Sequence, residues 1–198
     1  MEFELYFDYL CPFVYRASLL LASVAAERSP DVSWRYFSLT QVNSKDDGWT
    51  IWDAPAADRV RGRLAFKAAE AARRQGRFDV FHPALLAARH QARSDIDDVR
   101  VIEQVAEDSG LDLERFRLDV DDPSIMQALA RDHMQAVAKH GVFGTPTFVF
   151  PNGASAYIRL AESPAGAEAV DLYDRRIGMA ADEPRVLEIK RPVRPSPD

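Results

Sequence analysis

The stretch FDYLCPFVYR, residues 7–16, contains the only cysteine of the 198-residue chain. It overlaps the end of an alternating polar and apolar segment, residues 2–8, which predicts a β-strand. Apolar residues at helical spacing then predict a helix over 12–27, which Pro12 can open because the first turn needs no proline N–H. Cys11 is therefore predicted at the junction between a strand and a helix.

Outward from this junction, the chain predicts a β-α-β unit, a helical block and a β-β-α unit. Residues 32–39 alternate again, and a strand there would pair in parallel with the first through a right-handed crossover. A loop over 46–55 leads into helix-patterned sequence from Ala56 to about His140. Within this block, Asp97 and Ser124 are predicted helix N-caps. Three elements follow: a strand at 147–150, an antiparallel strand at 154–160 after the turn PNG, and a helix at 164–179.

This order predicts an α/β fold, a thioredoxin-like domain with an all-helical domain inserted in its middle. The thioredoxin-like domain would comprise residues 1–45 and 141–182, and the helical insertion residues 46–140. Residues 183–198 are rich in proline and charge, and they predict an extended C-terminal tail.

Composition narrows the function classes. The net charge is −6 and the pI about 5.3, so no nucleic-acid or anionic-membrane partner is indicated. The apolar stretch ASLLLASVAA has 10 residues, which is too short to cross a bilayer. Met1 leads directly into a strand pattern without a signal peptide, and one cysteine cannot form an internal disulfide. We therefore expect a cytoplasmic protein, and whether it forms a homodimer is left open.

The position of Cys11 suits a reactive thiol. Free backbone N–H groups and the positive end of the helix dipole at a helix start favour a thiolate, which is the nucleophilic form of cysteine. The alternative is a buried small hydrophobic residue, a common environment for a free cysteine. The residues around Cys11 leave both interpretations open.

A second distinctive stretch is GVFGTPTFVF, residues 141–150, in which Thr145 and Pro146 immediately precede a strand pattern. Proline lacks the N–H that a central strand needs, and a cis peptide bond at the strand start would accommodate it. An ordinary trans proline at the start of a strand is the alternative.

The pattern F-D-x-x-C-P-x-x-Y around Cys11, the helical insert and G-T-P-T near residue 145 together resemble the DsbA-like thioredoxin family. Within it, the segments SPAGAEAVDLYD and VLEIKRPVRPSP are similar to the cytoplasmic branch of FrnE-type and mycothiol-dependent reductases. The resemblance implies that Cys11 is the nucleophile and that Pro146 is the cis-proline facing it. It also implies substrate contacts at Pro12 and Phe13, the variable dipeptide, at Val14 and at the backbone of Thr145.

Val14 departs from the family pattern because it stands where the second cysteine of C-P-x-C would be. Without that cysteine, a mixed disulfide at Cys11 must be released by an external thiol. The resemblance then implies a monothiol oxidoreductase that acts on small-molecule or protein disulfides. Glutathione or mycothiol would be its co-substrate, with no tightly bound cofactor.

Two other functions remain open at this point. One is a glutathione- or mycothiol-dependent transferase or isomerase, similar to kappa-class glutathione transferases and 2-hydroxychromene-2-carboxylate isomerases, in which Cys11 would polarise a cofactor thiol. The other is a redox-inactive relative that binds a ligand or partner through the same groove.

Further candidates lie outside the two motifs. Trp49 and Trp52 could line a substrate cleft between the domains or simply anchor their loop. Asp8, at the end of the first predicted strand, could serve as an acid or base for the thiol or could cap a turn.

Basic and imidazole side chains give weaker signals. The four histidines have no spacing typical of a metal site, so no metal is expected. Four cations fall near one face of a predicted helix, either as a solvated face or as a surface that attracts the carboxylates of a thiol: Arg59, Arg63, Lys67 and Arg74.

Overall fold

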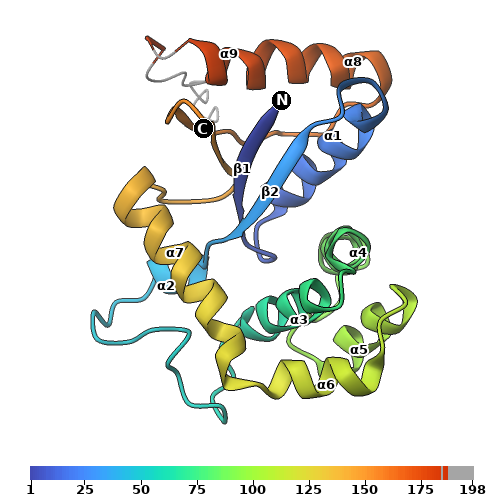
Figure 1. Ribbon diagram of the computed structural model, residues 1–198, viewed down its shortest axis with the longest axis vertical. Helices are drawn as coiled ribbons and strands as arrows, with labels where there is room; N and C mark the ends of the chain where they lie inside the picture. The colour runs from blue at the N-terminus through green and yellow to red at the C-terminus, as the bar shows by residue number, and fades with distance from the viewer. Residues whose placement is uncertain (184, 187–198) are drawn as a thin grey trace, which may run out of the picture.

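The computed structural model describes residues 1–183, 185 and 186, and most of the predicted C-terminal tail at 183–198 lies outside the described residues. Figure 1 shows a small sheet with helices packed around it and a separate group of helices at one end. The predicted α/β, thioredoxin-like fold class is confirmed, with four strands in the order β2-β1-β3-β4.

The β-α-β unit forms as the alternating and helical patterns predict. Strand β1 (Glu2–Phe7), helix α1 (Pro12–Arg28) and strand β2 (Asp31–Tyr36) follow one another, and the two strands pair in parallel. The second unit adds β3 (Thr147–Val149), antiparallel to β1, and β4 (Ser155–Tyr157), antiparallel to β3. Its last helix runs through α8 (Gly166–Leu172), the π-helical turn η2 (Tyr173–Ile177) and α9 (Gly178–Asp182).

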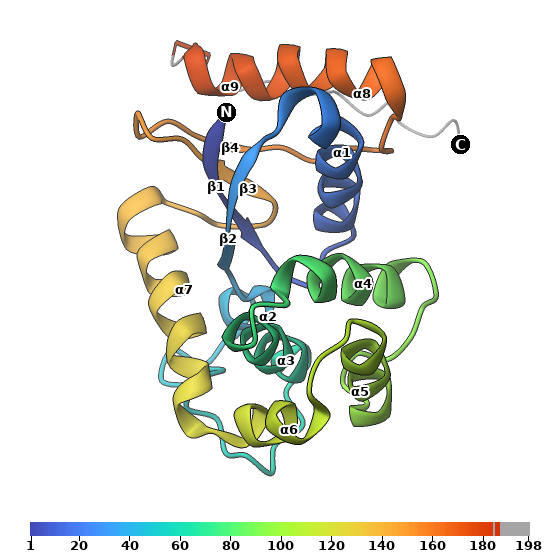
Figure 2. The ribbon, with the colours of Figure 1, turned by 45° about the vertical axis from the view of Figure 1, so that its right-hand side comes forward.

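Both faces of the sheet are covered. Apolar side chains of β1 and β3 pack with α1 and α8 on one face, where Leu5, Leu20 and Val170 belong to one buried cluster. On the other face, Tyr6, Phe37 and Val142 form a small cluster with Ala136 of the last inserted helix. Figure 2 shows α8 and α9 running across one end of the sheet, with α1 and α7 on its two sides.

The short helix α2 (Leu39–Val42) follows the first unit, and the segment predicted as the insertion, residues 46–140, is helical over most of its length. The elements of this segment are α3 (Arg63–Arg74), α4 (Phe78–His90), α5 (Val99–Asp108), α6 (Leu113–Asp121), the 3-10 turn η1 (Pro123–Ile125) and α7 (Met126–His140). Helix α7 returns the chain to the sheet, where Asp132 accepts the backbone N–H of Tyr36 at 3.1 Å and His133 accepts that of Ser38 at 3.1 Å.

The prediction of helix from residue 56 onward is wrong for residues 56–62, which form turns. The reason is the side chain of Arg63. Its guanidinium donates to the carbonyls of Ala54 at 2.8 Å, Pro55 at 3.0 Å and Asp58 at 2.6 Å. These carbonyls therefore bond to a side chain instead of to a helical N–H.

The second strand, predicted to reach residue 39, ends at Tyr36. It stops because Ser38 becomes the N-cap of α2, and its hydroxyl accepts the N–H of Gln41 at 3.1 Å. The strand predicted at 154–160 is also shorter, since β3 offers only the three residues Thr147–Val149 for pairing.

Both predicted N-caps are displaced. Asp98 caps α5, whereas the carboxylate of Asp97 accepts the N–H of Gly62 at 2.8 Å and so joins the loop before α3 to the start of α5. Asp122 caps η1 and accepts the N–H of Ser124 at 2.8 Å. In each case two neighbouring polar residues can occupy one cap position. At α5, Asp98 is the cap because the Asp97 carboxylate is bound to the N–H of Gly62.

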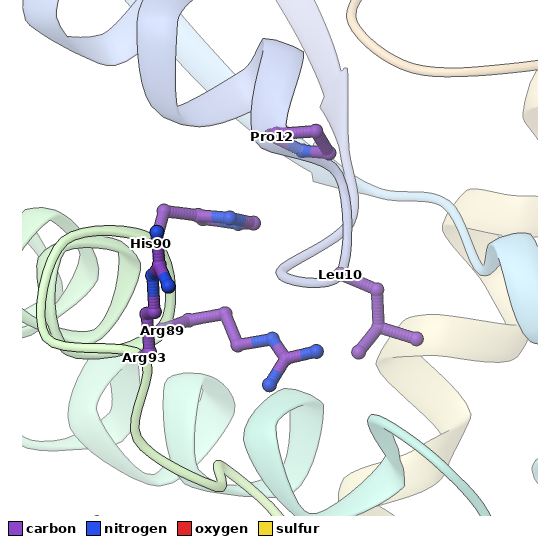
Figure 3. Close-up of a pocket in the computed structure, with 5 residues that line it drawn as sticks. All are labelled: Leu10, Pro12, Arg89, His90 and Arg93. Carbon is purple, nitrogen blue, oxygen red and sulfur yellow. The ribbon is translucent and has the colours of Figure 1, made fainter.

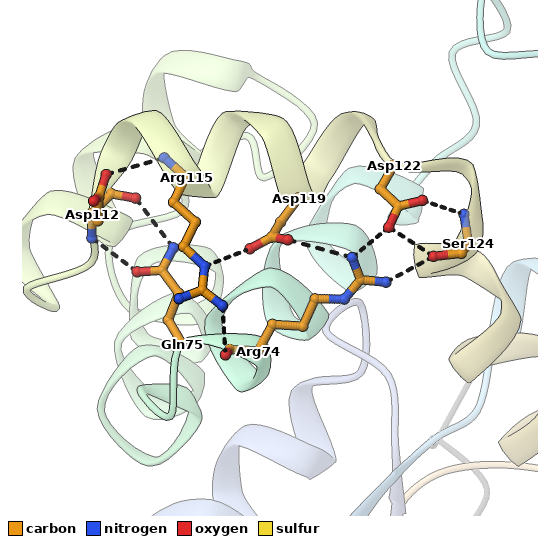
Figure 4. Close-up of polar contacts among 7 residues, drawn as sticks. All are labelled: Arg74, Gln75, Asp112, Arg115, Asp119, Asp122 and Ser124. Carbon is orange, nitrogen blue, oxygen red and sulfur yellow. Dashed lines mark hydrogen bonds and ion pairs between the residues drawn. The ribbon is translucent and has the colours of Figure 1, made fainter.

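Arg74 fastens α3 to the end of α6, as Figure 4 shows. Its guanidinium lies 2.7 Å from Asp122 and 3.4 Å from Asp119, and it donates to the hydroxyl of Ser124 at 3.1 Å. Hydrogen bonds from Arg74 and Ser124 lower the pKa of Asp122 to about 2. Because this pKa is lowered, the stabilisation is present above the ordinary value of 3.8 and is lost as the pH falls through about 2.

We expect Arg74→Ala to lower the melting temperature at neutral pH by a few degrees, because it removes partners from two acids at once. Arg100→Ala is the control, since Arg100 is 89% exposed and pairs only with Asp98 beside it. Thermal unfolding of both variants checks this. Equal losses in the two variants would show that the Arg74 contacts act as ordinary surface pairs.

Candidate active site

Cys11 lies in the turn between β1 and α1 and is the N-cap residue of α1. Its N–H donates to the carbonyl of Asp8 at 3.1 Å, and its own carbonyl accepts the N–H of Val14 at 3.2 Å. The side chain is only 4% exposed. The turn therefore holds the sulfur at the start of the helix, nearly closed off from solvent.

The Cys11 thiol points at the residue before Pro146. Its sulfur donates a hydrogen bond to the carbonyl of Thr145 at 3.2 Å, and the Thr145–Pro146 peptide bond is cis. Strands β1 and β3 pair with Tyr6 opposite Thr147, so the ends of the two strands meet at this point. Residues 134 positions apart in the chain are thereby placed in contact.

Asp8 holds the Cys11 turn in place through hydrogen bonds of its side chain. Its fully buried carboxylate accepts the N–H of Leu10 at 2.7 Å and that of Leu39 at 2.6 Å, which joins the Cys11 turn to the start of α2. Burial raises the Asp8 pKa to about 6, although these two hydrogen bonds act in the opposite direction. The turn-capping interpretation matches these contacts, and the acid or base role stays a prediction.

The three residues after Cys11 have different environments. Pro12 is exposed at the first position of α1. The half-buried ring of Phe13 lies between two guanidinium groups, Arg16 at 5.3 Å and Arg159 at 4.9 Å from its centroid. Val14 has no exposed surface and belongs to the larger core. The position of the missing second cysteine is thus part of the apolar interior.

A pocket of about 390 Å³ opens beside the turn, and Figure 3 shows the residues that line it: Leu10, Pro12, Arg89, His90 and Arg93. His90, at the end of α4, donates its Nε2–H to the carbonyl of Tyr9 at 2.9 Å. Burial lowers the pKa of His90, and the positive charges of Arg89 and Arg16 lower it further. Sequence analysis missed this pocket, for which the close spacing of three basic side chains at a helix end was the available signal.

Trp49 and Trp52 are half-buried against the core of the helical block. The Trp49 carbonyl accepts the side-chain N–H of Gln41 at 3.1 Å, and the Trp52 ring centroid lies 5.5 Å from that of His133. These contacts fit loop anchors. A role of the two tryptophans in substrate binding stays a prediction.

The basic stripe of α3 has partners within the chain. Arg63 holds loop carbonyls, Arg74 holds acids at the end of α6, and Arg59 pairs with Asp95 at 2.9 Å. Arg63 and Arg74 therefore bind groups of the chain itself, which neither sequence interpretation anticipated, whereas Arg59 is 74% exposed in its surface pair, as a solvated surface would have it. The cationic side chains of the pocket beside Cys11 come from α4 and the loop after it.

In the part of the chain that the structure describes, no group of three or more histidine, cysteine, aspartate or glutamate side chains is arranged to hold a metal ion. Within the same residues, every helix is too short or too polar to cross a membrane.

The arrangement supplies one sulfur, an adjacent backbone carbonyl and a cationic pocket. A thiolate at Cys11 can attack a disulfide to form a mixed disulfide. The chain contains no second cysteine to displace the product. A fold of this kind with a cysteine at the start of its first helix defines a thioredoxin-fold protein with a candidate redox site.

Comparison with protein families identifies the class further. The model of the DSBA-like thioredoxin domain matches residues 2–178, so the chain belongs to that family. Members of this family are thiol-disulfide oxidoreductases.

Three individual comparisons cover most of the chain. A Mycobacterium tuberculosis protein, described as uncharacterized, is 28% identical over 98% of this chain and 83% of its own length. The cytosolic disulfide reductase DsbM from Pseudomonas aeruginosa, solved with glutathione, has 18% identity and a TM-score of 0.57, covering 80% of this chain and 89% of its own. A 2-hydroxychromene-2-carboxylate isomerase has 15% identity and a TM-score of 0.61, covering 90% of this chain and 95% of its own. At these identities the two structures show the shared fold.

We expect Asp8→Ala to destabilise the protein by about 2–4 kcal/mol, because the buried N–H groups of Leu10 and Leu39 lose their acceptor. Because the Asp8 pKa is raised on folding, the folded state binds a proton more tightly than the unfolded state. The part of the unfolding free energy that comes from this difference is fully present below pH 3.8 and is lost as the pH rises through about 6. The difference in unfolding free energy between wild type and variant should therefore be larger at about pH 5 than at about pH 8.

Urea unfolding at the two pH values measures this difference. Asp47→Ala, which removes an exposed carboxylate of the loop after α2, is the control. The same wild-type-to-variant difference at both pH values would show that Asp8 titrates as an ordinary aspartate.

Proposed function

We propose that the protein is a monothiol thiol-disulfide oxidoreductase whose nucleophile is Cys11. The observation that carries the proposal is the Cys11 sulfur at the start of α1, 3.2 Å from the Thr145 carbonyl, with buried Val14 in place of a second cysteine. One thiol of this kind can exchange with a disulfide but cannot release the product through a neighbouring sulfur.

The reaction proceeds in two exchanges. The Cys11 thiolate attacks one sulfur of a small-molecule or protein disulfide, forms a new S–S bond and expels the other sulfur as a thiolate. A low-molecular-weight thiolate then attacks the substrate sulfur of the mixed disulfide and displaces the Cys11 thiolate. The substrate disulfide becomes one free thiol and one disulfide with the small thiol, so electrons balance without another reductant.

Family membership and the fold support this proposal. The similar Pseudomonas protein is a cytosolic disulfide reductase solved with glutathione, which favours a small thiol as co-substrate and a reducing compartment for this chain. Glutathione or mycothiol would bind transiently beside the Cys11 turn and the loop at Thr145.

A thiol-dependent isomerase or transferase is the second candidate. It is favoured by the similarity in fold to 2-hydroxychromene-2-carboxylate isomerase over 90% of this chain. The Cys11 thiol donates to a carbonyl and is 4% exposed, which is compatible with a group that orients a cofactor thiol without reacting. Covalent capture at Cys11 separates the two candidates.

We expect intact mass spectrometry to show one glutathione added per chain after exposure to oxidised glutathione, and reduced glutathione to remove it. Cys11→Ser is the control and should remain unmodified. Glutathione that binds without covalent capture would favour the isomerase or transferase. Neither binding nor capture would leave the redox-inactive relative.

Val14→Cys should restore a dithiol site. Residues three apart in a helix have Cα atoms about 5 Å apart, which lies within the Cα separation of about 4.4–6.8 Å that disulfides need. A mild oxidant should therefore join Cys11 to the new cysteine, and the variant should reduce insulin with dithiothreitol, whereas wild type should not.

The matched control is Ala17→Cys, another buried position of α1. It lies six residues from Cys11, about 9 Å along the helix axis, and should form no disulfide. The geometric basis of the proposed site would be wrong if Val14→Cys also stayed reduced.

A further inference from the structure

We propose that the pocket lined by Leu10, Pro12, Arg89, His90 and Arg93 is a carboxylate subsite for the small thiol that reacts at Cys11. It would make the protein prefer an anionic thiol such as glutathione over a neutral one such as mycothiol, which carries no carboxylate. This inference deepens the proposed function and rests on it. Below, these five residues are called the basic pocket.

The first support is the place of the basic pocket. Leu10 and Pro12 are the chain neighbours of Cys11, and Figure 3 shows them across the pocket from the basic side chains at the end of α4. The thiol of glutathione is on its central residue, so each carboxylate can lie at most about 5–7 Å along the chain from the sulfur. A pocket that begins at the residues on either side of Cys11 is in the range of that reach.

The second support is the charge left available there. Among the described residues, Arg89 makes one long hydrogen bond, to the carbonyl of Ser94 at 3.4 Å, and neither it nor Arg93 has a carboxylate partner. The acids of the neighbouring loop are already engaged. Asp95 pairs with Arg59, and Asp98 with Arg100. The guanidinium groups of the pocket thus lack an internal acid to neutralise them.

The third support is the wider field around the turn. The guanidinium groups of Arg16 and Arg159 lie 5.3 Å and 4.9 Å from the ring centroid of Phe13, the second residue after Cys11. This edge is cationic although the chain as a whole carries a net charge of −6. A localised positive region beside a reactive sulfur attracts anionic ligands.

Stabilisation of the α4 helix end explains only some of the basic side chains in the pocket. Cations in the last turn of a helix interact favourably with its dipole, and this applies to Arg89 and His90 in α4. Arg93 lies beyond the helix and has a φ of 59°, a left-handed conformation that would favour glycine. An arginine at this backbone position is better explained by its side chain than by the turn.

The chemistry of the pocket fits a carboxylate. A guanidinium presents N–H donors in a planar fork that matches two carboxylate oxygens. Glutathione carries two carboxylates, so one can bind here while its cysteine reaches the site. The pocket takes no part in making or breaking the S–S bonds at Cys11. Its role would be to bind the carboxylate of the small thiol while that thiol attacks the mixed disulfide or leaves.

The test measures the rate of mixed-disulfide formation at Cys11 by quenching and intact mass. The disulfide probes are oxidised glutathione, which is anionic, and mycothiol disulfide and hydroxyethyl disulfide, which are neutral. The double variant Arg89→Gln and Arg93→Gln should slow the reaction with oxidised glutathione about tenfold and leave both neutral probes unchanged. Added salt should slow the reaction of wild type with oxidised glutathione more than that of the variant, which keeps Arg16 and Arg159 but loses the two pocket arginines.

The control is the double variant Arg117→Gln and Arg175→Gln, which removes two exposed charges remote from the pocket and should change no rate. Equal slowing of anionic and neutral probes by the pocket variant, or no slowing at all, would overturn the subsite. Coenzyme A disulfide is a further probe. If it alone depends on the two arginines, the ligand is a phosphate and the carboxylate proposal is wrong.

If Cys11 forms no adduct with any probe, the proposed redox function is wrong. The subsite is then tested by a binding measurement. S-methylglutathione cannot exchange, and its affinity is measured by calorimetry with wild type and the pocket variant. A loss of about tenfold in the variant supports the subsite even without redox activity. Equal affinity, or no binding to wild type, contradicts it.

Discussion

The contact between the Cys11 sulfur and the Thr145 carbonyl depends on two features of the fold. It requires β1 and β3 to be neighbours in the sheet, and it requires the turn after β1 to stop at the start of α1. Asp8 supplies the second condition through two buried hydrogen bonds. The pairing of β1 with β3 and the turn after β1 thus fix the position of one sulfur atom.

The sequence pattern predicts most of the sheet because strand alternation and helical spacing are local properties. The parallel pair, the long first helix and the final hairpin follow directly from it. The turns over residues 56–62 could not be predicted, because the Arg63 side chain bonds to the carbonyls of Ala56 and Asp58 there and to two carbonyls just before them. The choice of Asp98 over Asp97 as a cap depends on a distant glycine N–H, which no local pattern contains.

The site shows the same division. Cys11 and Thr145 could be paired in advance only through the resemblance to a known family, since 134 residues separate them. The basic pocket could not be found, because it forms only when the end of α4 packs against the Cys11 turn. The arginines of α3 gave a misleading signal. Charge spacing along one helix shows which side chains share a face. It does not show which acids or carbonyls of the folded chain will bind them.

The small cluster of Tyr6, Phe37, Ala136 and Val142 has a consequence for how this architecture can be altered. It lies where the chain leaves the sheet and where it comes back, so the entry and exit of the helical excursion touch. An excursion whose ends already meet can change in length with little effect on the free energy of closing it. Surface loops of the region between Phe37 and Val142 can therefore be lengthened at little cost, provided that the residues packed against the Cys11 turn are kept.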